Sequence, residues 1–207
     1  MTPALVWITP PSGPLDFIAD ILGECEGDLS SLAVLHRRPD ENVRTRLRSA
    51  GLLRTHCAAR NVRLLTQDLE LALCVGADGV HLPERGAPVS ALRPHVSLLG
   101  ASRHSRAGFE EAFEAGADYC TLSPVFASPG KQAPLGLTAF SAMTRGLGPV
   151  LALGGVINAA TAHAAREHGA AGLATIRGVC SSATLLALLP PSHHLLDTLP
   201  PGGETVS

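Results

Sequence analysis

Short hydrophobic runs recur along this chain, and segments with helical spacing separate them. Within each run the apolar residues are mostly consecutive, which is typical of strands buried on both faces. A strand exposed on one face would instead alternate apolar and polar residues. The predicted strands cover residues 5–9, 31–36, 61–66, 78–82, 96–102, 118–126, 149–155 and 171–176.

The segments between the runs have the pattern of amphipathic helices, with apolar residues at helical spacing. Asn158 is expected to cap one of these helices, and Ser181 or Ser182 the last one. A further helix starts at the end of the stretch 116–137. The other predicted helices cover residues 14–26, 40–59, 105–115, 157–168 and 180–190, with short helices at 67–75 and 88–94.

Strict alternation of eight strands with eight helical segments predicts a parallel sheet. Eight such units within 207 residues predict an α/β fold of the (β/α)8 TIM-barrel type, in a single domain over residues 1–190. The alternative is an open doubly wound sheet, in which a GxGxxG turn is expected after the first strand. The corresponding turn here is TPPSG. Residues 191–207 are rich in Pro, Gly and Ser and are expected to form a flexible tail.

Composition narrows the classes of function. A net charge of −2 and an aromatic content of 3% argue against nucleic acid as a partner. No stretch reaches about 18 apolar residues, so no membrane span is expected. Five scattered cysteines without a CxxC pair, and an N-terminus unlike a signal peptide, predict a cytoplasmic protein. Each cysteine is interpreted as a small buried residue, with a catalytic thiol as the alternative.

Two neighbouring predicted loops have the composition of a phosphate site. Gly154 and Gly155 follow the seventh strand and allow backbone amides to approach an anion, with a helix start behind them. Arg177 and Gly178 hold the equivalent place after the eighth strand. The alternatives are glycines chosen for turn geometry and an Arg177 that points to water.

The loop after the sixth strand contains Ser128 and Lys131. A lysine on a mobile loop over the barrel mouth can close over an anionic ligand and exclude water. The alternative is a solvated loop lysine. After the third strand come Gln67 and Asp68, and the aspartate either holds Mg²⁺ or a ligand amine, or caps the short helix that follows it.

Two histidines are candidates for proton transfer, since imidazole titrates near neutrality. His104 follows the fifth strand, and its alternative role is capping or packing. His36 follows the second strand within a basic cluster that also holds Arg38. Alternation places these two residues on one face and Leu35 and Arg37 on the other, and the sequence does not say which face looks into the mouth.

Three stretches carry a resemblance to a known family. They are "DLELALCVGADGVHL" (68–82), "LGASRHSRAGFEEAFEAGADYCTLSPVFASPGK...PLGL" (99–137) and "PVLALGGVINAATAHAAREHGAAGLATI" (149–176). With these motifs in order, the chain resembles the thiamine phosphate synthase/TenI family over roughly residues 4 to 190. The resemblance implies a TIM barrel that binds a thiazole phosphate and, in the synthases, a pyrimidine pyrophosphate with Mg²⁺.

The resemblance also implies roles for individual residues. Lys131 matches a lid lysine that contacts the pyrophosphate in the synthases, and Asp68 matches the first of two Mg²⁺-binding aspartates. Arg38, Gln67 and Ser128 lie at further positions of the expected ligand-binding set. The thiazole phosphate is held at positions that match Gly154, Gly155, Ile176 and Arg177.

Departures from the family pattern concern the pyrophosphate. The second Mg²⁺ aspartate falls on Gly86, and the Asn of the family's Asn-Asp pair is Gln67. The family pattern Q-x-R-x-K after the second strand falls on His36, Arg38 and Asp40, so its lysine is missing. Loss of such contacts weakens binding of both metal and pyrophosphate.

"HLP" at 81–83 is more like the TenI branch, whose members include thiazole tautomerases that need no Mg²⁺. The tautomerase histidine after the sixth strand falls on Pro124, whereas His104 matches another histidine of that branch. The first expectation is therefore a thiazole phosphate binder with tautomerase activity. A divergent Mg²⁺-dependent synthase and a silent phosphate-ligand binder are the alternatives, and a homodimer is left open.

Overall fold

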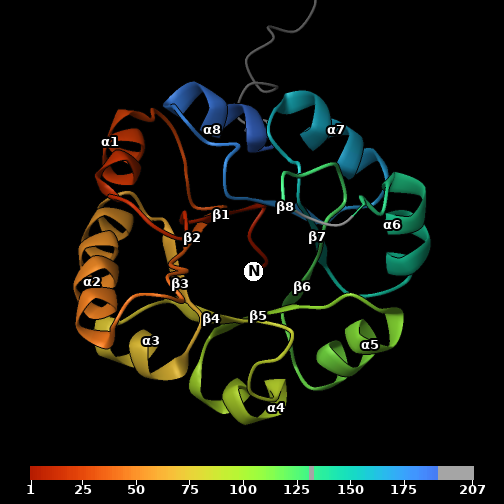
Figure 1. Ribbon diagram of the computed structural model, residues 1–207, viewed down its shortest axis with the longest axis horizontal. Coiled ribbons are helices and arrows are strands. Elements are labelled where there is room, and N and C mark those ends of the chain that lie inside the picture. The colour runs from red at the N-terminus through yellow and green to blue at the C-terminus, as the bar shows by residue number, and fades with distance from the viewer. Residues whose placement is uncertain (131–132, 191–207) are drawn as a thin grey trace, which may run out of the picture.

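The computed structural model describes residues 1–130 and 133–190, and eight parallel strands form a closed barrel surrounded by helices (Figure 1). Each strand pairs with the next in sequence, and β1 pairs with β8 to close the ring. The strands are β1 Leu5–Ile8, β2 Leu32–Leu35, β3 Arg63–Thr66, β4 Gly79–Leu82, β5 Leu98–Ser102, β6 Tyr119–Leu122, β7 Val150–Leu153 and β8 Gly172–Thr175.

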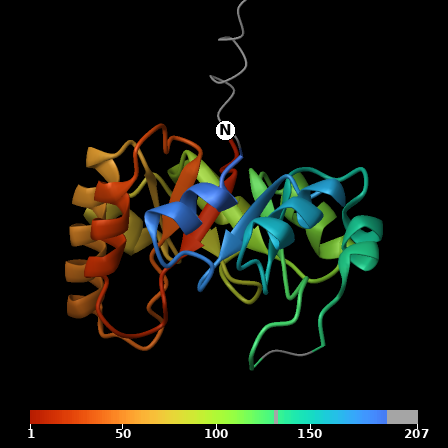
Figure 2. The same ribbon diagram turned by 90° about the horizontal axis from the view of Figure 1, so that it is seen from above.

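The helices lie outside the barrel, one after each strand, and cover its outer face (Figures 1 and 2). The fourth connection holds a short α-helix followed by a 3-10 turn, Arg93–His95. The α-helices are α1 Asp16–Glu24, α2 Val43–Ala59, α3 Leu69–Val75, α4 Val89–Leu92, α5 Arg106–Glu114, α6 Leu137–Thr144, α7 Ala159–Glu167 and α8 Ser182–Leu188. The predicted (β/α)8 TIM barrel is confirmed; the predicted tail, residues 191–207, lies outside the described residues.

Sequence chemistry accounts for where the helices begin and end. The Asn158 side chain accepts the Thr161 amide while the Thr161 side chain accepts the Asn158 amide, which is a closed capping box at α7. Ser181 makes the same arrangement at α8, so the cap is Ser181 and not Ser182. At the end of α3, Gly76 has φ of 64° and forms a left-handed cap, a conformation that glycine adopts readily.

Every strand is shorter than the hydrophobic run that predicted it. The largest difference is at β6, which ends at Leu122 although the run extends to residue 126. Ser123 and Pro124 follow, and a proline has no amide to donate to a neighbouring strand. Pairing beyond this point continues only as isolated hydrogen bonds, such as Val125 N to Leu153 O at 2.9 Å.

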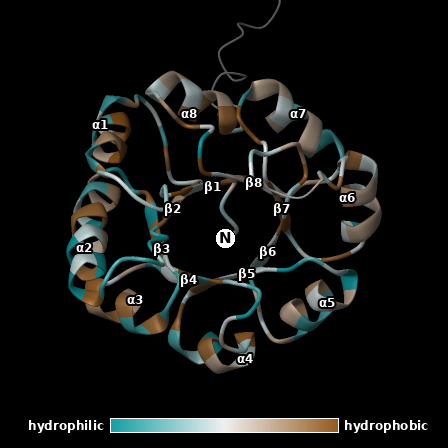
Figure 3. Ribbon diagram, in the orientation of Figure 1, coloured by the Kyte–Doolittle hydropathy of each residue, from teal (hydrophilic) through white to brown (hydrophobic). Residues whose placement is uncertain are grey.

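The core has two layers because both faces of each strand are covered. The larger layer lies between sheet and helices, and helices such as α1, α2 and α5 carry both hydrophobic and hydrophilic residues, as expected when one face packs on the barrel (Figure 3). The smaller layer fills the inside of the barrel and includes Val6, Leu35, Leu65 and Leu151, with Tyr119 fully buried among them. No helix among the described residues is long and apolar enough to cross a membrane.

Candidate functional site

A cavity of about 280 Å³ opens at the carboxyl ends of the strands, and we call it the mouth pocket. This is the end of a (β/α)8 barrel at which ligands bind. Figure 2 shows residues 123–130, which follow β6, reaching beyond the other described loops at this end. The pocket is lined by Ile8, Leu35, Arg37, Gln67, His81, Pro83, Glu84, Ser102, His104, Ser123, Pro124, Ser128, Leu153, Gly154, Ile176 and Arg177.

The structure settles which face of β2 looks into the mouth. Leu35 and Arg37 line the mouth pocket, whereas His36 and Arg38 face the opposite way, toward α2. The Arg37 backbone is held by Thr9, whose Oγ1 accepts the Arg37 amide at 2.9 Å. Sequence reasoning therefore missed Arg37, which lines the mouth pocket together with Arg177. The signal that could have found it is the register, because Leu35 pairs with the inward-facing Ile8 of β1.

His36 is buried between β2 and α2, with Nε2 2.8 Å from the Ser49 hydroxyl. Burial, with smaller contributions from the positive charges of Arg38 and Arg46, lowers its pKa to about 4 against the opposing effect of Asp68. The imidazole is thus neutral near pH 7 and lies outside the mouth pocket. It lies with Arg38, Gln67 and Asp68 around a small cavity behind the mouth pocket, apart from His104 and the glycine and arginine loops, and its catalytic role stays a prediction.

Arg38 is also buried on this outer side of the sheet. Its Nη2 donates to the Gly13 carbonyl at 2.7 Å, and its Nη1 lies 3.3 Å from a Glu41 carboxylate oxygen. These contacts tie the β1–α1 loop to the start of α2. Arg38 is therefore placed to support the loops around the mouth rather than to reach into it.

The predicted glycine and arginine loops meet as expected after β7 and β8. They line a second cavity of about 280 Å³ that adjoins the mouth pocket and shares Ser128, Gly154, Ile176 and Arg177 with it. The Arg177 Nη2 donates to the Ser128 hydroxyl at 3.2 Å, which links the β8 loop to the loop after β6. We call the part formed by Gly154, Gly155, Ile176 and Arg177 the cradle.

Close approach of backbone requires the glycines of the cradle. Gly154 and Gly155 have φ of 92° and 69°, which favours glycine. A Cβ on Gly154 would lie 2.7 Å from the Pro124 Cα, and one on Gly155 would lie 2.6 Å from the Ala127 carbonyl oxygen. Within the described part of the chain, the amides of Gly155 and Arg177 donate to no other backbone group. The cradle therefore offers amide donors and one guanidinium, which suit an anion.

A hydrogen-bonded group of side chains lies beneath the mouth, and sequence reasoning did not select it. The Tyr119 hydroxyl lies 3.0 Å from His81 Nδ1, and His81 Nε2 lies 3.0 Å from the Ser102 hydroxyl. Ser102 in turn lies 3.2 Å from the Thr121 hydroxyl. Burial lowers the pKa of His81 to about 4, with smaller contributions from Arg103 and Arg37.

His104 stands at the rim of the mouth pocket, where its Nδ1 lies 2.8 Å from a Glu84 carboxylate oxygen. Both side chains are about half exposed, at 47% and 48%. A carboxylate beside an imidazole orients the ring. The pair has the geometry of a proton donor and acceptor within reach of a ligand in the pocket.

Asp68 caps α3, which is the alternative to a role in binding Mg²⁺ or a ligand amine. Its Oδ1 accepts the Leu71 amide at 2.7 Å, and its Oδ2 accepts from Arg46 Nη2 at 2.9 Å. The neighbouring Gln67 lines the mouth pocket, whereas Asp68 lies in a small cavity behind it. The aspartate predicted as a metal ligand is thus turned away from the mouth and already has two partners.

The described residues do not fit the two-carboxylate Mg²⁺ set that the family resemblance implies. Glu84 supplies the one carboxylate among the residues that line the mouth pocket. Gly86 stands at the second aspartate position and closes a turn, with its amide on the Pro83 carbonyl at 3.0 Å. No group of three or more His, Cys, Asp or Glu side chains that could hold a metal occurs among the described residues. Lys131, the predicted lid lysine, lies outside the described residues.

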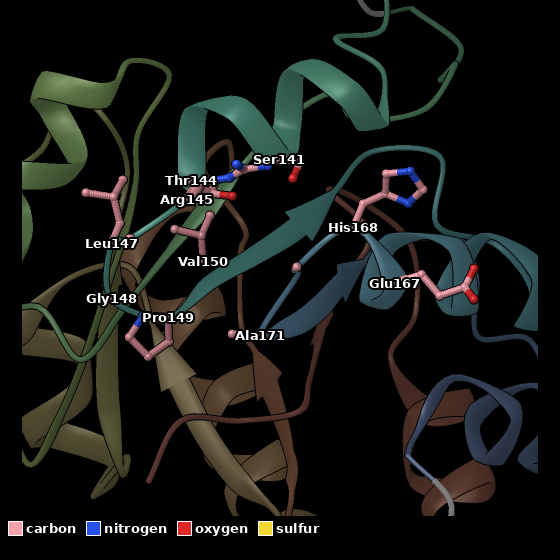
Figure 4. A pocket seen from close by; sticks show the side chains of 12 residues that line it. Ser141, Thr144, Arg145, Leu147, Gly148, Pro149, Val150, Glu167, His168 and Ala171 are labelled. Carbon is pink, nitrogen blue, oxygen red and sulfur yellow. The ribbon is translucent and has the colours of Figure 1, made fainter.

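A larger cavity of about 560 Å³ opens at the opposite end of the barrel (Figure 4). It lies where β7 begins and where α6 and α7 end, and Arg145, Glu167 and His168 contribute its charged or titratable side chains. His168 bonds its own helix, with Nδ1 2.8 Å from the Ala164 carbonyl oxygen. This end of a barrel serves stability rather than chemistry, so size does not make this cavity the functional site.

The fold and the mouth together define a (β/α)8 barrel with an anion cradle after β7 and β8. The chain belongs to the thiamine monophosphate synthase family, whose model matches residues 24–179. That model carries the names of both the synthase and the TenI branches, so the match does not assign the chain to either one.

Relatives support the same family. A Geobacter sulfurreducens protein named as a candidate thiamine-phosphate synthase is 36% identical over 195 residues, covering 87% of this chain and 90% of that protein. The thiamine-phosphate synthase of Synechococcus sp. (strain CC9311) is 36% identical over 156 residues, and the match spans 72% of this chain but 44% of that longer protein.

A solved structure agrees with the fold. Thiamine phosphate pyrophosphorylase from Pyrococcus furiosus superposes with a TM-score of 0.74 at 25% identity, covering 89% of this chain and 92% of the other. The chain is thus related to thiamine biosynthesis. The relatives named for an activity carry synthase names, so the comparisons favour the synthase alternative over the tautomerase that the sequence placed first.

Proposed function

We propose that this chain binds a thiazole phosphate at the mouth of its barrel and joins it to a pyrimidine pyrophosphate, as a divergent thiamine-phosphate synthase. The observation that carries the proposal is the cradle. Gly155 and Arg177 offer backbone amides, and the Arg177 side chain lies against Ser128 at the edge of the same cavity. The synthase names of the relatives supply the reaction.

The pyrophosphate needs a second cationic region, and Arg37 supports one. β2 lies two strands from β8 around the closed barrel, with β1 between them. Arg37 thus stands on the side of the mouth nearest the cradle, where its guanidinium can bind phosphate oxygens in bidentate fashion. In the coupling, the bond from the pyrimidine's methylene carbon to pyrophosphate breaks, a bond to the thiazole ring nitrogen forms, and pyrophosphate leaves.

The test is direct. Purified protein is incubated with pyrimidine pyrophosphate and thiazole phosphate, and thiamine phosphate is measured with and without added Mg²⁺. Formation of thiamine phosphate that falls at least tenfold in Arg37→Gln supports the proposal. Binding of thiazole phosphate by calorimetry with no product under either condition would refute the coupling step while leaving the binding step in place.

A tautomerase is the second candidate function, and the pair of Glu84 with His104 favours it. This reaction moves a proton between two atoms of the thiazole ring and needs an acid/base rather than a pyrophosphate site. The pair lies at the rim of the mouth pocket, within one carboxylate–imidazole hydrogen bond of 2.8 Å. If His104→Ala protein tautomerises the thiazole at the full rate, His104 is removed from this role.

A further inference from the structure

Four side chains form a continuous hydrogen-bonded row inside the barrel. The row runs from Tyr119 to His81, then to Ser102 and Thr121, with successive distances of 3.0, 3.0 and 3.2 Å. Tyr119 is fully buried and does not line the mouth, whereas His81 and Ser102 do. Gly100 makes the row possible, because a Cβ there would overlap the Tyr119 ring.

The direction of the first hydrogen bond follows from burial. Among the described residues the Tyr119 hydroxyl has no hydrogen-bond partner except His81 Nδ1. A buried hydroxyl proton without an acceptor costs about 1–3 kcal/mol, so Tyr119 donates and Nδ1 accepts. Burial raises the pKa of Tyr119 and lowers that of His81 to about 4, so neither group changes its protonation near neutrality. The single ring proton of His81 therefore sits on Nε2.

The same reasoning fixes the next two bonds. His81 Nε2–H donates to the Ser102 oxygen. Thr121 is 2% exposed, and within the described residues its hydroxyl has Ser102 as its side-chain partner, so it also donates to Ser102. A hydroxyl oxygen accepts two hydrogen bonds. With both lone pairs of Ser102 occupied, its own proton is left to point into the mouth pocket.

We propose that Tyr119 and His81 are positioning residues that set the Ser102 hydroxyl as a hydrogen-bond donor aimed at the ligand. This inference rests on the proposed function and deepens it. The ligand presents an unprotonated acceptor there, such as a carboxylate oxygen or a ring nitrogen other than the one that forms the new bond, and an N–H at that position is rejected. Because β6 separates β5 from the cradle strand β7, the acceptor belongs to the ring part of the ligand rather than to its phosphate.

A measurement without ligand tests the hydrogen-bond direction. Long-range proton–nitrogen NMR spectra of protein labelled with ¹⁵N in its nine histidines distinguish the two tautomers, and His81→Asn identifies the signal. We expect Nδ1 without a proton and Nε2 with one from pH 6 to pH 8. A proton on Nδ1 would overturn the proposal. If the NMR spectra show the expected tautomer but the protein binds no thiazole phosphate, the proposed function is contradicted and the hydrogen-bond direction is not.

Binding variants test the link to the ligand. Calorimetry with the phosphorylated thiazole carboxylate should show affinity about tenfold lower in Ser102→Ala and in Tyr119→Phe, the size of one hydrogen bond. The double variant should bind no more weakly than Ser102→Ala, because Tyr119 acts through Ser102. Additive losses, or full affinity in Tyr119→Phe, would overturn the proposal.

A matched control separates this effect from general loosening of the core. Thr144→Val also removes one buried hydroxyl, which donates to the Phe140 carbonyl at 3.0 Å within α6. That bond lies at the opposite end of the barrel, beside the larger cavity. We expect Thr144→Val to keep the affinity of the unchanged protein. A loss equal to that of Tyr119→Phe would show that any missing buried hydroxyl weakens binding, and would overturn the positioning role.

Discussion

Replacing Gly155 by alanine tests whether the cradle depends on backbone contact between two loops. Gly155 has φ of 69°, and its Cβ would lie 2.6 Å from both the Ala127 carbonyl oxygen and the Phe126 Cβ. The left-handed conformation costs an alanine about 1–2 kcal/mol. Forcing a methyl group into closely packed atoms adds about 1–3 kcal/mol. The unfolding free energy should therefore fall by roughly 2–5 kcal/mol.

Gly76→Ala is the matched control, because Gly76 has nearly the same φ of 64° and nothing lies within 4 Å of its added Cβ. This variant carries the conformational cost without the clash, about 1–2 kcal/mol. Urea denaturation followed by circular dichroism gives both free energies, and their difference isolates the contact between the loops. For a chain of this size, each kcal/mol lowers the midpoint of thermal unfolding by about 2–4 °C.

Alternatively, the loop after β6 moves away from the new methyl group. In that case stability is partly recovered, but the cradle widens and phosphate binding weakens, which calorimetry with thiazole phosphate would detect. Equal losses of stability in Gly155→Ala and Gly76→Ala, with thiazole phosphate bound by both as by the unchanged protein, would refute a role for the contact between the loops.

Three further predictions concern charged or titratable groups. Asp68→Asn should keep the cap of α3, change stability by less than about 1 kcal/mol and leave any Mg²⁺ dependence of activity unchanged; a lost Mg²⁺ dependence would restore the metal role. His36 has a pKa of about 4 in the folded protein and 6.5 in the unfolded chain. Its neutral form therefore stabilises the folded state fully above pH 6.5, and this part of the unfolding free energy, at most about 3 kcal/mol, is lost as pH falls toward 4. Between pH 7 and pH 4.5 the unfolding free energy should fall less in His36→Gln than in the unchanged protein, as measured by denaturation at both pH values. An equal fall in the two proteins would contradict this prediction. Arg177→Gln should leave the unfolding free energy within about 0.5 kcal/mol and weaken thiazole phosphate binding at least tenfold; unchanged binding would place Arg177 outside the phosphate site.

The sequence predicted the barrel because its evidence is local and repeated. Eight apolar runs, helix caps such as Asn158 and left-handed glycines such as Gly76 each report on a few neighbouring residues, and all of them agree with one fold. The cradle was predictable for the same reason, since Gly154 and Arg177 stand directly after strands whose neighbours the fold specifies. The structure brings these residues together as expected.

Other features of the site depend on the direction of a side chain, and the sequence pattern did not contain it. Arg37 and Arg38 are adjacent and identical in type, and only the register of β2 against β1 decides which one faces the mouth. The link from Tyr119 to His81 joins residues 38 positions apart on β6 and β4. Both residues lie within their strands rather than in the loops that follow, so the loop sequences do not point to them.

The distribution of charge around the mouth bears on how a synthase could work without paired aspartates. Because the barrel is closed, β7, β8, β1 and β2 form one continuous arc, and this arc carries the cradle amides, Arg177 and Arg37. The opposite arc, from β4 to β6, carries His81, Ser102 and, at the rim, the pair of Glu84 with His104, and it contributes no lysine or arginine to the described lining of the mouth pocket. A ligand that is anionic at one end and a neutral heterocycle at the other would be oriented by these two arcs. In such a site the guanidinium groups take over the neutralisation of phosphate charge for which Mg²⁺ would otherwise be needed, and a synthase reaction at this mouth should therefore depend more on Arg37 than on the metal concentration.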